Sequence, residues 1–371
     1  MNTSWFGRLL ILISLCVPGN LVLMTAPALA VDCVYVAARK ATECQPGADL
    51  AITRLVQASH ATSEAVRVRL MQQYFAIGAG QEIAPILNYA TQSDEETADG
   101  VFAGFVEQPQ TSVPTHSAWG DLGGIYSNRT SATSGFEGAM FSGSFGVDRQ
   151  VGEGGVIGLF GGLETSYYDT TSATGTGFLR GKGFSTGVYA GQLLGDNVFA
   201  NTTLGYRQID NSFEIGATGA TYLSRSLNAS ANLTGYYQFD YLRVSPKAGI
   251  GLSHEWRDGY TETSGAVSLA QETTSGSTSA GIEAGYTFVS ADGRTVEPWV
   301  SANLEWLFLD TSAPAPPPSP DPLNAVDVRL GAGINAAISD SVSLSVRGDV
   351  SGLTTPNYIV VSAGGQLSVR F

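Results

Sequence analysis

Residues 357–371 read NYIVVSAGGQLSVRF and decide the fold expected of this chain. Every second position from Ile359 is apolar or small, and most positions between them are polar or small. Because side chains point to opposite faces of a strand in turn, the pattern predicts a strand with one apolar and one polar face. Leu367, Val369 and the last residue, Phe371, share the apolar face.

The composition of the chain favours a membrane protein built of strands. Only 14% of the 371 residues are charged, against about 25% in typical soluble domains, and 45 residues are glycine. After residue 30 there is no run of roughly 18 apolar residues that would cross a membrane as a helix. Transmembrane strands alternate between polar and apolar residues, so they agree with both observations.

Alternation with a period of two continues through residues 116–371 and predicts about twelve strands. They cover residues 119–126, 136–148, 156–168, 178–193, 198–209, 222–239, 241–256, 276–289, 295–309, 325–338, 342–350 and 357–371. The sequence therefore predicts an all-β fold, a twelve-stranded antiparallel transmembrane β-barrel. The last strand should pair with the first, because a barrel in a membrane must close.

The predicted connections alternate in length, as in bacterial barrels, which have short periplasmic turns and long outer loops. Short turns are expected at residues 149–155, 195–197, 239–241, 291–293 and 339–341. Long loops are expected at residues 128–135, 169–177, 210–221, 257–275 and 310–324, the last with a proline-rich stretch at 313–320. An even number of strands would leave both barrel ends on the periplasmic side.

Several charged residues fall on the expected interior face of the strands. We expect the lumen to be lined by Arg207, Arg243, Glu283, Glu305, Arg329 and Arg347. Such charges are tolerated in a wet lumen, whereas an Arg on the lipid face at the midplane costs about 2–4 kcal/mol. Their mixed signs indicate interior ion pairs, or contacts to a segment that threads the pore, rather than a selectivity filter.

The N-terminal part of the chain differs from the strand region. Residues 1–30 resemble a cleaved secretory signal peptide, in which Ala28 and Ala30 form the small-x-small cleavage site. Residues 31–115 are expected to be a short, mainly helical region and linker, with a helical stretch at about 48–75 and a further candidate at 81–89. Cys33 and Cys44 predict a disulfide in an exported protein, with two independent thiols as the alternative.

Other function classes receive little support. A net charge of −14 without a basic cluster excludes nucleic acid as a partner. No metal-ligand spacing or phosphate-binding loop is present, so no metal or cofactor is expected.

Ser253, His254 and Glu255 are residue types of a catalytic triad, but neighbours on a strand point to opposite faces. We therefore expect a histidine at the barrel rim and no enzyme, with a barrel hydrolase as the alternative. Three nearby acids are candidate cation ligands or, more simply, solvated charges: Asp258, Glu262 and Glu272.

The order of these features resembles the autotransporter (type V secretion) family. Local matches are Trp119-Gly120 at the first strand, FGVD at 145–148, EAGYTF at 283–288, VEPWV at 296–300 and the terminal LSVRF. The resemblance covers roughly residues 116–371 and implies a translocator barrel in the bacterial outer membrane. It also implies that the barrel assembly machinery reads the terminal strand, with Leu367, Val369 and Phe371 on its lipid face.

The function implied by this resemblance is to translocate or display residues 31–115, as a minimal passenger, at the cell surface. The alternative for these residues is that they stay in or below the pore as a plug. These residues are few for a passenger, and they contain no Asn-Asn pair that would suggest cleavage. The alternative is a diffusion pore, or a barrel whose loops bind a surface ligand. In both cases the lipid bilayer is a partner, and a closed barrel without free edges favours a monomer.

Overall fold

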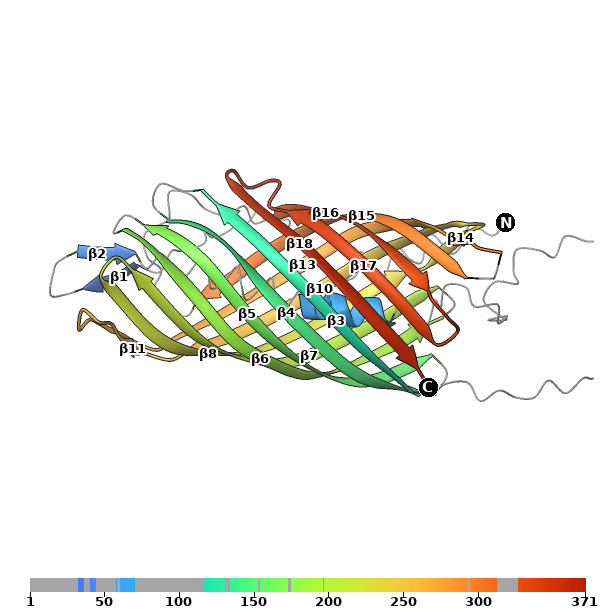
Figure 1. The fold of residues 1–371 in the computed structure, drawn as a ribbon, viewed down its shortest axis with the longest axis horizontal. Coiled ribbons are helices and arrows are strands. Elements are labelled where there is room, and N and C mark those ends of the chain that lie inside the picture. The colour runs from blue at the N-terminus through green and yellow to red at the C-terminus, as the bar shows by residue number, and fades with distance from the viewer. Residues whose placement is uncertain are drawn as a thin grey trace, which may run out of the picture.

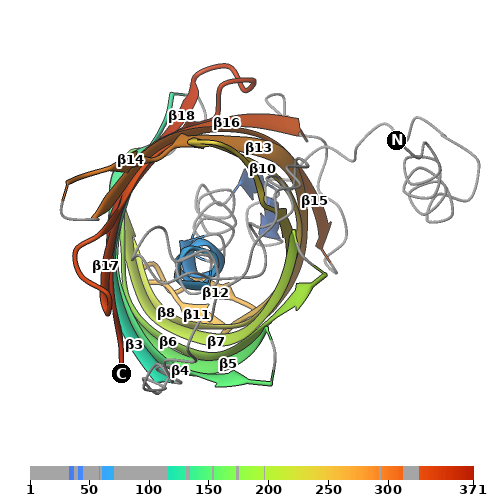
Figure 2. The same ribbon diagram turned by 90° about the vertical axis from the view of Figure 1, so that its right-hand side faces the viewer.

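The computed structural model describes residues 33–36, 41–44, 58, 61–70 and 116–371, apart from 131–133, 153, 173–174, 196, 292–293 and 312–325. Within these residues, twelve long antiparallel strands form a closed barrel (Figures 1 and 2), as the sequence predicts. They are β3 (His116–Arg129), β4 (Ser134–Val151), β5 (Gly155–Ser172), β6 (Gly175–Leu194), β7 (Val198–Ile215), β8 (Thr218–Gly235), β10 (Leu242–Arg257), β13 (Gln271–Tyr286), β15 (Thr295–Thr311), β16 (Val326–Ala337), β17 (Val342–Ser351) and β18 (Tyr358–Arg370).

The ring closes between the last strand and the first, as expected. β18 pairs with β3 from Tyr358↔Arg129 to Arg370↔Ser117. Beyond the ladder, the amide of Phe371 donates to the carbonyl of His116 at 2.9 Å, and the reverse hydrogen bond is 3.2 Å long. The last residue of the chain is thus held to the first residue of the barrel, and no long strand keeps a free edge.

Apolar side chains cover the outer face of the sheet and polar side chains line its inner face, the reverse of a soluble protein. Large apolar side chains such as Leu122, Leu163 and Val300 are 73%, 69% and 62% exposed on the outer face. On the inner face of β7, by contrast, Asn201 and Thr203 are buried. An apolar outer band around a polar interior is the pattern of a barrel that faces lipid. Among the residues described, no helix is long and apolar enough to cross a membrane.

The connections define two ends of the barrel. We call the loop end the one with connections 130–133, 173–174, 216–217, 258–270, 312–325 and 352–357. The turn end has connections 152–154, 195–197, 236–241, 287–294 and 338–341, together with His116 and Phe371. Short strands lie at both ends. At the loop end β11 (Tyr260–Thr261) pairs with β12 (Val267–Ser268), and at the turn end β9 (Tyr237–Phe239) pairs with β10 and β14 (Phe288–Val289) with β15.

Two of the predicted long loops are wrong. The β5–β6 ladder continues to Ser172↔Gly175 and the β7–β8 ladder to Ile215↔Thr218, so residues 169–177 and 210–221 belong to long hairpins with two-residue connections. The first stretch is rich in threonine and glycine, and the second mixes Phe213 and Ile215 with polar residues and glycines, so neither shows the alternation that marks a membrane strand. The β-branched residues among them suit a paired strand without a regular apolar face.

Two elements precede the barrel in the chain. Residues 61–70 form a helix inside the ring (Figure 2). β1 (Cys33–Val36) pairs with β2 (Ala41–Cys44), a hairpin that the sequence did not predict, at the loop end (Figure 1). The signal peptide with Ala28 and Ala30, the rest of the expected helical stretch 48–75, the candidate helix 81–89 and the proline-rich stretch 313–320 lie outside the described residues.

Candidate functional site

The centre of the barrel is occupied by the helix of residues 61–70, which we call the lumen helix. Its sequence, ATSEAVRVRL, places Val66 and Leu70 four residues apart on one face. Glu64 and Arg67, three residues apart, form an ion pair with a shortest N–O distance of 2.5 Å. The helix therefore has an apolar side and a charged side, and each side meets a different wall of the barrel.

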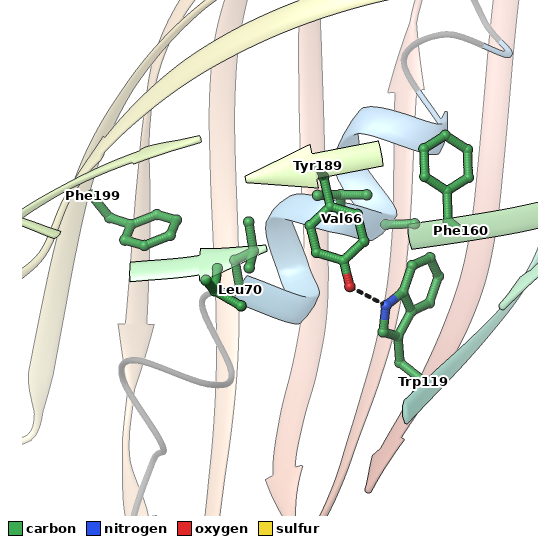
Figure 3. Packing of buried hydrophobic residues seen from close by; sticks show 8 residues of the cluster. Val66, Leu70, Trp119, Phe160, Tyr189 and Phe199 are labelled. Atoms are coloured by element: carbon green, nitrogen blue, oxygen red, sulfur yellow. Dashed lines mark hydrogen bonds between the residues drawn. The ribbon is translucent and has the colours of Figure 1, made fainter. Parts of the chain in front are cut away.

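The apolar side packs against the wall formed by β3 to β7 (Figure 3). Val66 and Leu70 are fully buried in a cluster with Ala65, Trp119, Val156, Phe160, Tyr189 and Phe199. Burying a valine or leucine side chain contributes about 1.5–3 kcal/mol. Aromatic rings of the cluster lie close to glycines of neighbouring strands; a Cβ on Gly146 would lie 2.5 Å from the ring of Trp119. These glycines make room for the cluster inside a narrow barrel.

A buried polar network ties the same side of the helix to the wall. The guanidinium of Arg69 donates to both carboxylate oxygens of Asp148 in β4 at 3.0 Å, and it also contacts Ser117 of β3. The hydroxyl of Tyr189 donates to Asp148 at 2.8 Å and accepts from the indole of Trp119 at 2.7 Å (Figure 3). The carboxylate thus holds one helix residue and three strands together.

The charged side of the helix meets the opposite wall. Arg67 lies 3.6 Å from a carboxylate oxygen of Glu283 in β13. Glu283 also accepts from Arg243 of β10 at 2.7 Å and pairs with Lys247. Glu283 is therefore the point where the helix joins a charge network of the wall, and each charge in this group has an opposite partner.

This network extends along the wall towards the turn end. Arg243 donates to Glu297 of β15 at 2.7 Å, and Asn335 of β16 donates to the same carboxylate at 3.3 Å. Tyr236, in the connection after β8, has its ring 5.8 Å from the guanidinium of Arg243. Burial and the carboxylate of Glu297 raise the pKa of Tyr236 to about 12, so its phenol stays neutral.

Three further hydrogen bonds hold the first turn and the backbone of the lumen helix. Ser63 lies within 3.1 Å of Ser230 and 3.2 Å of Asn232, both in β8. Gln366 of β18 donates to the carbonyl of Ala65 at 2.8 Å and is fully buried. The helix is therefore contacted from several sides of the ring, including the terminal strand.

The six residues predicted to line the lumen all lie in ion pairs on the inner face. Besides the Arg243 and Glu283 contacts, Arg207 pairs with Glu164 at 2.5 Å, Arg347 with Asp121 at 2.7 Å, and Arg329 with Glu305 at 2.8 Å and with Asp349. Sequence reasoning did not find Asp148 or Arg69. Asp148 stands in the FGVD match at 145–148, but that match carried no role for the carboxylate.

The lumen helix has a defined direction. Near its start, Ala58 and Ala61 pack with Ile125, Met140 and Val360, which lie in the loop-end halves of their strands. At its end, Arg69 contacts Ser117 and Asp148, which lie at the turn end of β3 and β4. The lumen helix thus runs from the side of the loop end, where β1 and β2 lie, towards the turn end, where β3 begins (Figure 1).

The remaining candidate residues are placed as follows. Leu367, Val369 and Phe371 are 47%, 37% and 66% exposed on the outer face, whereas Gln366 and Ser368 are buried inside. Cys33 and Cys44 are direct partners in the β1–β2 register.

The possible triad and the acids near it are separated in the structure. Ser253 points inward and donates to Asn228 at 2.5 Å, while His254 points outward and contacts Thr274 at 2.8 Å. Asp258 pairs with Arg225, Glu262 accepts from Ser264, and Glu272 lies 3.8 Å from His254. Ser253 and His254 are therefore on opposite faces of the sheet, as strand geometry requires.

Comparison with known proteins agrees with this architecture. The autotransporter beta-domain model matches residues 118–349, more than half of the chain, and the chain belongs to this family. It is a translocator-type β-barrel of the outer membrane. No protein of curated function matches the sequence.

Two solved structures share the fold. The beta domain of the Bordetella autotransporter Brka is 18% identical with a TM-score of 0.57, and the match covers 69% of this chain and 100% of that chain. The translocator domain of NalP from Neisseria meningitidis is 12% identical with a TM-score of 0.54, and the match covers 71% of this chain and 90% of that one.

Proposed function

We propose that the barrel displays the segment upstream of the lumen helix at the cell surface and keeps residues 61–70 in the pore as a plug. The observation that carries this proposal is the direction of the helix. It enters from the end that bears β1 and β2, and it ends beside Asp148 at the turn end. A segment carried outward by such a barrel would lie at the loop end.

The contacts of the lumen helix support a plug rather than an open diffusion pore. Arg69 and Asp148 are buried together on one wall, and Arg67 contacts Glu283 on the other. Because the helix is held from both sides, we do not expect a large constant conductance. The diffusion pore therefore receives less support than display.

The displayed segment is proposed to include a small disulfide-closed hairpin. Cys33 and Cys44 are opposite each other in an antiparallel pair. The Cα atoms of such partners are about 4.5–5.5 Å apart, which falls within the range of about 4.4–6.8 Å found in disulfides. Cleavage after Ala30 would leave this hairpin close to the mature N-terminus.

The remaining parts of the proposal follow from family membership. The loop end would face outside and the turn end the periplasm, because bacterial barrels place their short turns there. The terminal strand with Leu367, Val369 and Phe371 would be the segment read by the assembly machinery. The closed ring supports a monomer.

Antibody labelling of intact cells tests the display. An epitope placed directly after Asp32 should be labelled on intact cells. A matched epitope in the turn at residues 195–197 should be labelled only after the outer membrane is permeabilised. If the epitope after Asp32 also requires permeabilisation, the N-terminal segment is not displayed.

A further inference from the structure

Basic side chains on the outer face of the barrel are few, and most of them gather at one place. On the strands that the structure describes, Arg180, Lys182, Arg225 and Arg149 follow the phase of the exposed apolar residues. The first three lie towards the loop end of β6 and β8. Arg149 lies at the opposite end, in the last residues of β4. Three of the four outward cations therefore lie towards the loop end, where outward acids of β5 and β7 stand among them: Asp169, Asp210 and Glu214.

Arg180 and Lys182 lie where the lipid-facing band ends. On the same face of β6, the next residue towards the bilayer is Phe184, which is 42% exposed and whose ring centroid lies 6.3 Å from that of Tyr206. The guanidinium of Arg180 lies 4.4 Å from the ring centroid of Phe178 and 5.2 Å from that of Tyr167. Aromatic side chains mark the level of the lipid headgroups in membrane proteins, so the two cations are positioned at that level.

The two cations also differ from the other basic residues in their partners. Arg225 forms a paired contact with Asp258 at 3.0 and 3.4 Å. Within the described residues, neither Arg180 nor Lys182 has a carboxylate within ion-pair distance, and both are exposed. Three acids are near by register. Asp210 is opposite Lys182 in the β6–β7 ladder, and Asp169 and Glu214 lie on either side of Phe178 in β5 and β7. Asp169 accepts from Tyr167 at 2.7 Å.

We propose that Arg180 and Lys182 bind a phosphate group of a lipid headgroup in the outer leaflet. A guanidinium and an ammonium on one strand face offer a planar fork and a point charge to the same anion. The headgroup would lie over the rings of Phe178 and Tyr167, and its acyl chains would descend along Phe184. Basic side chains at the membrane surface attract anionic lipids in this way.

This inference rests on the orientation given under the proposed function, in which the loop end faces outside. In that leaflet the phosphate-bearing lipids of a bacterial outer membrane are phosphorylated glycolipids. Binding in purified protein does not depend on orientation, whereas antibody labelling does. A protein that binds the lipid but shows no surface label would contradict the orientation alone.

The test compares lipid retention by the purified full-length chain and two variants. Diphosphoryl lipid A and its monophosphoryl form serve as probes, and bound lipid is measured by native mass spectrometry. R180Q/K182Q removes both cations, and R149Q removes the outward cation at the other end. We expect wild type and R149Q to retain the diphosphoryl lipid about tenfold better than R180Q/K182Q, since hydrogen bonds to charged groups contribute measurably. The monophosphoryl form should be retained less well by wild type.

Three outcomes would overturn the proposal. Equal retention by wild type and R180Q/K182Q would show that the pair does not bind phosphate. An equal loss in R149Q would show a general effect of net charge. Retention that is abolished by EDTA but unchanged in R180Q/K182Q would assign the lipid to a cation bridge through Asp169 and Asp210.

Two controls complete the experiment. Inorganic phosphate at the same phosphate concentration should not displace the lipid, and displacement would assign the site to free phosphate instead. Heat-modifiable mobility in electrophoresis verifies that each variant is a folded barrel, so that a loss of lipid is not a loss of fold.

Discussion

Arg69 of the lumen helix and Asp148 of β4 form a buried ion pair in which both nitrogen–oxygen contacts are 3.0 Å long and the side chains are 1% and 0% exposed. Removing one member of such a pair leaves an uncompensated buried charge, which typically costs about 3–5 kcal/mol. The pair joins the lumen helix to the wall beside the first strand of the barrel, and its loss should therefore act first on the docking of the helix.

We expect Asp148→Ala to release the lumen helix from the β3–β6 wall. The purified variant should show more frequent and larger conductance events in planar lipid bilayers than wild type. A chain lacking residues 61–70 gives the upper limit for an unplugged barrel. Wild-type conductance in Asp148→Ala would mean that this ion pair does not hold the plug.

Tyr189→Phe tests the hydroxyl that links Trp119 to Asp148. The ring and its packing remain, but the indole loses its acceptor and the carboxylate loses a donor. An unsatisfied buried polar group costs about 1–3 kcal/mol. We expect a lower unfolding temperature, measured by the loss of heat-modifiable mobility, with Tyr167→Phe on the exposed face as the control. Equal effects of both variants would contradict a special role for Tyr189.

Glu283→Gln should destabilise the barrel more than the exposed substitution Glu137→Gln. Glu283 has three basic neighbours, Arg67, Arg243 and Lys247, and all three would lose a charged partner. The double variant E283Q/K247Q should recover part of the stability, because one of the unpaired cations is then absent. The unfolding midpoint in guanidinium measures this. If K247Q lowers the unfolding midpoint by the same amount in wild type and in E283Q, Glu283 and Lys247 are not coupled.

Phe371→Ala should reduce the amount of assembled barrel in the outer membrane several-fold. Its backbone is held by His116, and its ring stacks with that of His116 at a centroid distance of 6.4 Å. Ile359→Ala changes the same face of β18 at the loop end and serves as the matched control. The heat-modifiable fraction in isolated membranes is the measurement, and equal fractions for both variants would argue against a terminal signal.

The proposed Cys33–Cys44 disulfide predicts that alkylating reagents will label the exported chain only after reduction. Cys33→Ser should leave Cys44 reactive without a reducing agent. Labelling of the untreated wild-type chain at both cysteines would show two independent thiols instead.

Sequence reasoning succeeded where the type of each residue depends only on whether its side chain faces lipid or the lumen. Each of the twelve predicted strands overlaps a strand of the structure, because the bilayer imposes a period of two on every strand separately. It failed at residues 169–177 and 210–221, where glycine, threonine and charged residues obscure the period of two although the ladders continue. The β1–β2 hairpin was also missed, since two four-residue strands carry almost no periodic signal.

By itself the sequence determined the barrel, its closure by the strand at 357–371, and the inward phase of the six charged residues expected in the lumen. Only the tertiary structure decided which charges meet. Arg69 and Asp148 are separated by 79 positions, and Gln366 and Ala65 by 301. Such pairs exist because the closed ring brings the last strand beside the first, with the lumen helix between the walls. The physical reason is that alternation is a local consequence of lipid and water, whereas the partner of a lumen charge depends on the shear and closure of the whole ring.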